Sequence, residues 1–241
     1  MSTFVAVHSA PERARLELRA GALVPREIER TATTARVALV AGGALLLGGD
    51  RVHLDIVVGH DCVLEIEDIG GTVAYDADGE DSGWSTTVTV EAGGTLSWSS
   101  WPFVISSGAA VQRSLRVDLA PGARACIRET IVLGRTGEVG GTARIRTDAS
   151  LGERPLFVEE LLVDGARSVP GVLGGNRVLD TILFLGDRPA TTEAPSNVFE
   201  LESPGAVARS LGTQTHRANL DELWKSWHEE LLRPSNVGIS R

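Results

Sequence analysis

The sequence predicts a mainly β protein in which short strands form a β-helix-like stack, with a helix near the C-terminus. Three observations predict this fold. Apolar and polar residues alternate through the first two-thirds of the 241 residues, 27 residues are glycine, and a strand–turn–strand unit recurs along the chain. Period-two alternation is typical of half-buried strands, and frequent glycine turns favour short strands over long helices.

The clearest predicted strand covers residues 51–58. Its apolar side chains share one face and its polar side chains the other, as the pleat of a half-buried strand requires. The apolar set is Val52, Leu54, Ile56 and Val58, and the polar set is Arg51, His53 and Asp55. The same alternation occurs in shorter stretches at 16–18, 87–90, 115–119 and 143–147.

A strand, a glycine turn and a second strand recur three times, at 54–64, 88–96 and 117–127. The turn glycines Gly59, Gly93 and Gly122 are 34 and 29 residues apart. Repeats of this length indicate stacked units that bury their apolar faces against one another. Because the spacing drifts, we expect a β-helix-like stack rather than a strict solenoid.

The character of the chain changes after the predicted β body, which covers about 14–186. Turn-forming residues are frequent over 187–205 (among them Pro189, Pro195 and Ser196), which predicts a surface loop. Residues 187–241 are expected to add this loop and a helical part to a single domain that covers 1–241.

A helix is predicted at about 220–232. Asn219 is expected to cap its first turn and Glu222 to complete a capping box, and Pro234 to end it. Its apolar residues recur at helical spacing and form one stripe that consists of Leu220, Leu223, Trp224, Trp227 and Leu231.

Charge and hydropathy exclude several classes of protein. The formal net charge is −9, from 23 Lys and Arg against 32 Asp and Glu, and no basic run is present, which argues against nucleic-acid binding. The longest apolar stretch, 37–49, is shorter than the ~20 residues of a membrane span. Residues 1–10 lack the pattern of a secretory signal. We therefore expect a soluble, cytoplasmic protein.

Most enzyme signatures are absent: no nucleophile elbow, phosphate-binding loop, dinucleotide-binding fingerprint or zinc-protease motif occurs. One pattern nevertheless suggests an alternative function. His53 and Asp55 project together from one strand, and with the distant His216 they resemble the two-histidine, one-carboxylate site of an iron-dependent β-helical oxygenase. The simpler interpretation is an exposed polar strand face. A plain β-sandwich binding module is a third alternative.

A second group of possible metal ligands consists of His53, Asp55, His60, Asp61 and Cys62. Imidazole and thiolate suit nickel, copper or zinc. Cys62 alternates in register with Leu64 and Ile66, however, which favours a core position for its side chain. The pattern therefore predicts weak metal handling and no closed structural site.

Glu129 and Glu159 stand within strongly apolar strand sequences. A carboxylate there is costly unless it is paired or hydrated. Two interpretations stay open: the solvent face of an edge strand, and a polar passage in the interior.

Several motifs, taken in order, resemble those of the UreD (UreH) family of urease accessory proteins. The most specific is Glu129 to Glu138, with its acidic residue, its Leu-Gly-Arg and its Gly-Glu steps. The other motifs are 48–58, 63–66, 96–98, 102–105, 108–109 and 155–159. The chain departs from the family pattern around 67–75, at 101–102 and in its C-terminal tail, which indicates a divergent branch.

The resemblance implies a non-enzymatic scaffold with two layers of β-helical strands and a pair of helices, so one or two helices are expected. It implies partners of three kinds: a helical accessory protein, an accessory GTPase and the subunits of apo-urease. It also implies that nickel passes through the protein transiently. Carried over by position, the lining of the nickel passage would fall at Asp50, Thr72, Glu129 and Glu159.

Overall fold

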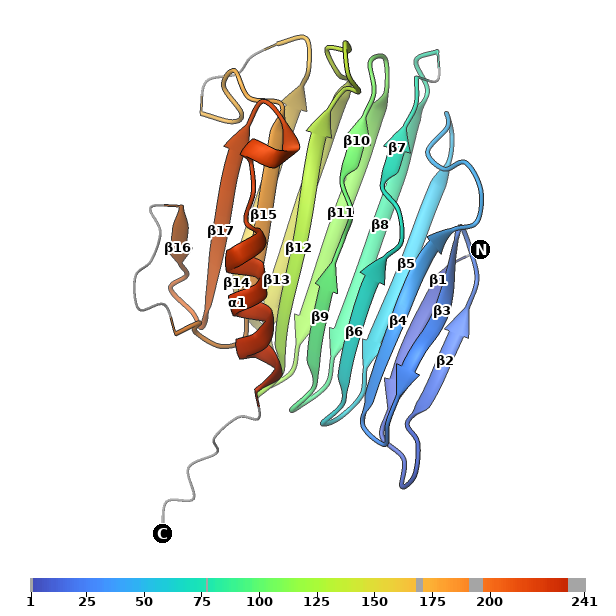
Figure 1. Cartoon of the computed structure of the whole chain (residues 1–241), viewed down its shortest axis with the longest axis vertical. Coiled ribbons are helices and arrows are strands. Elements are labelled where there is room, and N and C mark those ends of the chain that lie inside the picture. Colours follow the sequence, from blue (N-terminus) through green and yellow to red (C-terminus); the bar gives the residue numbers. More distant parts are fainter. Residues whose placement is uncertain (1, 77, 168–170, 191–196, 234–241) are drawn as a thin grey trace.

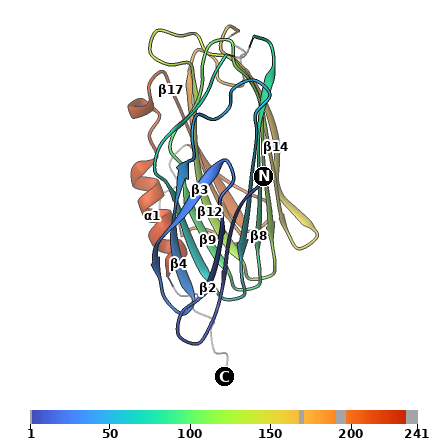
Figure 2. The same ribbon diagram turned by 90° about the vertical axis from the view of Figure 1, so that its right-hand side faces the viewer.

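The computed structural model describes residues 2–76, 78–167, 171–190 and 197–233. Two β-sheets face each other, and a helix lies on the outer side of one of them (Figure 1, Figure 2). The predicted mainly β, stacked architecture is confirmed, including its two layers.

The first sheet, sheet A, has seven strands. In spatial order they are β14 (Arg154–Asp164), β13 (Thr142–Leu151), β11 (Ala110–Leu119), β8 (Asp81–Val90), β5 (Arg51–Val58), β1 (Thr3–His8) and β2 (Arg15–Arg19).

The second sheet, sheet B, has ten strands. The main path runs β16 (Val198–Glu200), β17 (Gly205–Gly212), β15 (Val178–Leu185), β12 (Arg124–Leu133), β9 (Thr95–Ser99), β6 (Val63–Asp68), β4 (Thr34–Ala41) and β3 (Leu23–Arg30). Two short strands lie off this path: β10 (Phe103–Ile105) pairs with β12 and with β7 (Thr72–Ala74).

The chain winds from one sheet to the other, and each turn places the next strand parallel to the previous one. β5, β8, β11 and β13 are joined by parallel pairings in sheet A, and β4, β6, β9 and β12 in sheet B. Corresponding residues of the predicted repeat lie side by side, so that Ile56 pairs with Val88 and Val88 with Val117. The period-two pattern of one coil is therefore in register with that of the next.

The turn glycines of the repeat stack with the strands. Gly93 and Gly122 have φ values of 69° and 76°, a region that favours glycine. A Cβ atom on Gly93 would lie 2.0 Å from Oδ1 of Asp61 in the neighbouring turn, so any other residue there would have to displace the Asp61 side chain as well as adopt a backbone conformation that favours glycine. At both ends of the stack antiparallel strands replace the parallel coils.

The β body extends further than the predicted 14–186. It begins with β1, and β16 and β17 follow residue 187, so the predicted loop at 187–205 contains a short strand. Pro195 and Ser196 lie outside the described residues. The β body extends past residue 186 because β17 pairs antiparallel with β15, and β16 pairs antiparallel with β17. These are long-range contacts that turn composition does not reveal.

Helix α1 (Asp221–Leu232) lies within a residue of the predicted bounds and packs on the outer face of sheet B over β9 and β12 (Figure 2). Trp227 and Leu231 are buried, and the Trp227 ring meets that of Phe184 edge to face at 5.6 Å. The 3₁₀ turn Thr215–Arg217 precedes the helix. Within the described part of the chain no helix is long and apolar enough to cross a membrane.

The capping box is not formed. Glu222 pairs instead with Lys225, and Asn219 accepts a hydrogen bond from the Asp221 amide at 2.7 Å. The first turn is held by Asp180 of β15, whose Oδ2 accepts from the Leu220 amide at 3.1 Å. Pro234, predicted to end the helix, lies outside the described residues.

Candidate functional site between the sheets

Charged side chains enter the space between the sheets on the side where β12 to β17 close the stack. Strand alternation turns Glu129 inward together with Ile127 and Ile131, and Glu159 inward together with Phe157 and Leu161. Although β14 is the edge strand of sheet A, its Glu159 faces sheet B. The interior interpretation of these two carboxylates is therefore the one that the structure supports.

Glu129 is paired with Arg113 of β11. The Glu129 side chain is 17% exposed and that of Arg113 only 6%, so the pair is largely removed from water. Nε of Arg113 donates to Oε1 of Glu129 at 3.1 Å, and Nη2 donates to the same oxygen. The guanidinium also lies over two aromatic rings, 4.5 Å from the centre of Phe103 and 5.2 Å from that of Trp84.

Glu159 is paired with Arg209 of β17 in a two-pronged arrangement. Nη1 of Arg209 donates to Oε1 at 2.7 Å, and Nη2 donates to Oε2. Such bidentate pairs are among the strong hydrogen bonds of proteins. The guanidinium lies 6.0 Å from the centre of the Phe157 ring.

Glu129 and Glu159 line one cavity, whose walls come from both sheets. The cavity has a volume of about 30 Å³, which is room for one water molecule or a small ion. The polar lining consists of Glu129, Glu159, Arg209, Thr147 and Thr181, and the rest is apolar. Two carboxylates and two hydroxyls thus face a small space in an otherwise aliphatic interior.

A third carboxylate, Asp68, belongs to the same charged region. It ends β6 on the inward face, and Trp98 Nε1 donates to its Oδ1 at 3.1 Å. Burial raises the pKa of Asp68 to about 6; the hydrogen bond from Trp98 and the charge of Arg113 oppose this rise, and the charge of Glu129 adds to it. Asp68 therefore shares its electrostatic environment with the Arg113–Glu129 pair.

Sequence reasoning missed Asp68, Arg113 and Arg209. The signal was present, because Asp68 alternates in register with the core residues Leu64 and Ile66, as Arg113 does with Val111 and Leu115. A charged residue that takes an apolar position in a period-two pattern indicates a side chain in the interior. This inference holds for arginine as it does for glutamate.

Asp50 and Thr72 do not line the cavity that holds Glu129 and Glu159. The half-buried Asp50 closes a turn before β5, where its Oδ2 accepts from the Leu47 amide at 2.9 Å. Thr72 begins β7, and its amide donates to the Pro102 carbonyl at 3.1 Å. The structure brings two of the four carried-over residues together and places the other two elsewhere.

The group of His53, Asp55, His60 and Cys62 does not assemble. His53 and Asp55 lie on the outer face of β5, where His53 bonds to Ser85 Oγ at 2.6 Å and Asp55 accepts from Ser2 Oγ at 2.6 Å. His60 is exposed in the following turn, while Cys62 is buried in the core. The pleat and the turn separate residues that are adjacent in sequence.

The iron site proposed as an alternative is not formed either. His216 lies in the 3₁₀ turn beyond β17, whereas His53 and Asp55 belong to sheet A. Among the residues that the structure describes, no group of three or more His, Cys, Asp or Glu side chains is placed to hold a metal ion. The geometry gives the oxygenase alternative no support.

The most specific sequence motif builds a rim beside β12. A Cβ atom on Gly134 (φ 73°) would lie 2.7 Å from the Gly140 amide nitrogen, so the turn requires glycine. Arg135 donates to Glu138 at 2.7 Å and, with the Arg135 amide, holds the pKa of Glu138 down at about 2.

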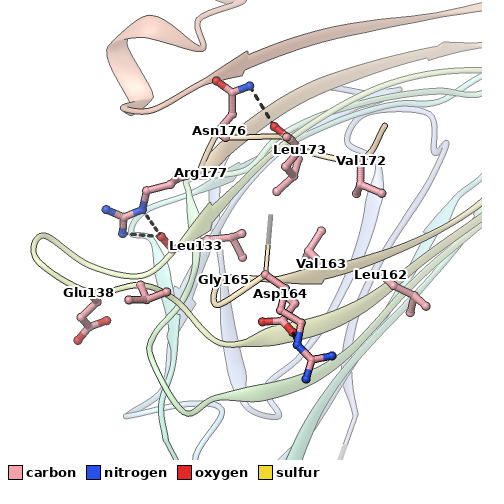
Figure 3. A pocket seen from close by; sticks show the side chains of 14 residues that line it. Leu133, Glu138, Leu162, Val163, Asp164, Gly165, Val172, Leu173, Asn176 and Arg177 are labelled. Atoms are coloured by element: carbon pink, nitrogen blue, oxygen red, sulfur yellow. Dashed lines mark hydrogen bonds and ion pairs between the residues drawn. The ribbon is translucent and has the colours of Figure 1, made fainter. Parts of the chain in front are cut away.

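Arg177 fixes the same turn from a second loop. Its Nε and Nη2 donate to the Leu133 carbonyl at 2.9 and 2.6 Å (Figure 3). The hollow drawn in Figure 3, about 190 Å³, lies between this turn and β14 and is lined in part by Leu133, Val163 and Leu173. The part of the motif from Gly134 to Glu138 thus has a structural role next to the charged interior, whereas its first residue, Glu129, lies within that interior.

Comparison with known proteins agrees with these motifs. The family model described as UreD urease accessory protein matches residues 7–237. A urease accessory protein UreD 1 of Streptomyces griseus is 43% identical over 219 residues, which cover 89% of this chain and 86% of the relative. A urease accessory protein UreD of Streptomyces avermitilis is 33% identical over 73% of this chain and 71% of its own.

Proposed function

The chain belongs to the UreD family of urease accessory proteins, and on that premise we propose that it is a non-enzymatic scaffold that assists the insertion of nickel into apo-urease in the cytoplasm. The partners we propose are those that the family resemblance implies: a helical accessory protein, an accessory GTPase and the subunits of apo-urease.

We propose further that nickel passes between the two sheets, through the cavity lined by Glu129 and Glu159. The observation that carries this proposal is the inward position of both carboxylates in one small space. Carboxylate oxygens bind Ni²⁺ less firmly than thiolate or imidazole do. A lining of oxygen ligands therefore suits a path that must release its metal. Asp50 and Thr72 lie outside the cavity, so we leave them out of this segment of the path.

The test uses urease maturation in cells that express the urease subunits and all accessory proteins. In the double variant Glu129→Gln/Glu159→Gln, the nickel content of purified urease is expected to fall at least about tenfold, since each charged oxygen ligand contributes more than a neutral amide. The complex with the accessory proteins should still form, because the substitutions are interior and keep the side-chain shape.

The matched control is Glu160→Gln. Glu160 follows Glu159 on β14 but faces outward, where it pairs with Arg144 and is 35% exposed. This variant should load urease normally. Normal nickel loading of urease in cells that carry the double variant would refute the passage through this cavity. The scaffold role would be refuted if the wild-type protein co-purified with none of the accessory proteins and none of the urease subunits.

A further inference from the structure

Each of the two carboxylates of the cavity accepts hydrogen bonds from a guanidinium group through oxygens that could otherwise bind a metal cation. We propose that Arg113 and Arg209 are the resting counter-ions of this passage, and that a divalent first-row metal cation exchanges with them. This inference rests on the proposed function for its biological role, but it concerns the metal affinity of the chain itself.

The two pairs differ in how far they block their carboxylate. Both bonds from Arg113 end on Oε1 of Glu129, and no residue in the described part of the chain donates a hydrogen bond to Oε2. Arg209 instead covers both oxygens of Glu159. A cation can therefore bind Glu129 through Oε2 beside its arginine, whereas at Glu159 it must displace the guanidinium.

Neither guanidinium is fully satisfied in its pair. Nη1 of Arg113 and Nε of Arg209 are buried and have no hydrogen-bond partner. A buried donor without an acceptor costs free energy. Each ion pair therefore stabilises the protein less than a pair in which every N–H group of the arginine has an acceptor. This weakness favours exchange over a permanent salt bridge.

Aromatic rings can stabilise each guanidinium by a cation–π interaction when it leaves its carboxylate. The Arg113 guanidinium already lies 4.5 Å from the centre of Phe103 and 5.2 Å from that of Trp84, and Arg209 lies 6.0 Å from that of Phe157. Cations are attracted to ring faces within about 6 Å. A small rotation can thus free a carboxylate without leaving the arginine buried and unpartnered.

Charge balance explains why arginine is needed. Two carboxylates without counter-ions in an interior of low polarity would be strongly destabilising in the empty protein. They would also hold a divalent cation tightly once it had bound. Because the guanidinium competes for the same oxygens, it stabilises the empty state and weakens metal binding, which lets the cation leave.

The experiment measures Ni²⁺ binding to the purified full-length chain by competition with a coloured chelator. Arg209→Gln is expected to raise the affinity at least about tenfold, the equivalent of one charged hydrogen bond released from competition. Arg113→Gln should raise it less, since Oε2 of Glu129 is already open. The double variant Arg209→Gln/Glu159→Gln should lose the gain.

Arg116→Gln is the matched control, because Arg116 is on the same strand as Arg113 but faces outward and pairs with Asp118. It should bind Ni²⁺ as the wild type does. Arg209→Lys keeps the positive charge but not the fork, and should give an intermediate affinity even if the glutamine variant folds poorly.

Wild-type affinity in folded Arg209→Gln and in Arg209→Lys would overturn the exchange. So would an equal gain in Arg116→Gln. The proposed function has a separate failure: a Glu129→Gln/Glu159→Gln protein that loads urease normally would refute the passage but leave the affinity gain of Arg209→Gln unchanged.

Discussion

The space between the sheets differs in character from one side of the stack to the other. Between β5 and β6 it is filled by aliphatic side chains, such as Leu54, Ile56, Leu64 and Ile66, which are at most 1% exposed. Beside β12 and β14 the equivalent inward positions hold Glu129 and Glu159 with their arginines. The strand frame is the same in both regions, with period-two alternation and two facing sheets.

The comparison separates what builds the frame from what is added to it. Stacking of coils requires inward side chains that bury apolar surface, and the side chains of the aliphatic region meet this requirement. Buried ion pairs rarely stabilise a fold more than well-packed apolar residues would. Their presence on one side of the stack is therefore better explained by a function than by stability.

The largest effect is expected from breaking one ion pair on one side only. Arg113→Leu leaves the Glu129 carboxylate without its donor and should lower the free energy of unfolding by about 3–5 kcal/mol, measured by urea denaturation. The double variant Arg113→Leu/Glu129→Leu should recover most of this loss. A double variant as unstable as the single one would mean that the charged region supports the fold after all.

In the aliphatic region, Leu64→Ala should cost about 3 kcal/mol of unfolding free energy through loss of burial and an internal cavity. It should not change the Ni²⁺ affinity of the folded protein. Val158→Ala, at a side chain that is 58% exposed, serves as the control and should change stability by less than about 0.5 kcal/mol. Altered metal binding in folded Leu64→Ala would show that the two regions are coupled.

Asp68 gives a pH-dependent contrast at the border between the regions. Its pKa is about 6 in the folded protein and about 3.9 in an unfolded chain. The folded protein therefore keeps a proton that the unfolded chain releases, so this residue destabilises the fold increasingly from about pH 4 to pH 6 and by a constant amount above about pH 7.

Replacement by asparagine removes that penalty and keeps an acceptor for Trp98. Asp68→Asn should stabilise the protein by about 3 kcal/mol at pH 8, from the difference between the two pKa values, and should match the wild type near pH 4. Urea denaturation at both pH values measures it. An equal effect at the two pH values would contradict the assigned titration.

The smallest effect is expected outside the interior. Arg116 is 67% exposed and bonds to Asp118 at 2.7 Å. Exposed pairs of this kind contribute little, so Arg116→Gln should leave the midpoint of urea denaturation essentially unchanged. A thermal-unfolding shift as large as that of Arg113→Leu, three residues earlier on the same strand, would remove the distinction between inner and outer charges.

The frame could be predicted because its causes are local. Alternation along 51–58 and the glycine turns at Gly93 and Gly122 depend on a few neighbouring residues, and β5 has the predicted bounds. The repeat also implied the stacking, since each unit leaves an apolar face that only another unit can cover.

The partners of the charged residues could not be predicted in this way. Arg209 lies 50 residues from Glu159 in the chain, and Asp180 lies 40 residues from the Leu220 amide that it binds. Such pairs depend on the antiparallel strands that close the stack. Conversely, the predicted group around His60 and Cys62 failed because neighbours in sequence point in different directions.

The chain order of the cavity walls has a consequence for synthesis. Parallel coils can be added one at a time, since each buries its face on the one before. Glu159 on β14 leaves the ribosome well before Arg209 on β17, so a nascent chain carries the acidic wall before its guanidinium. The cavity that we propose for the metal is therefore the last part of the body to be completed, and a chain that stops before β17 has the coils without the closed cavity.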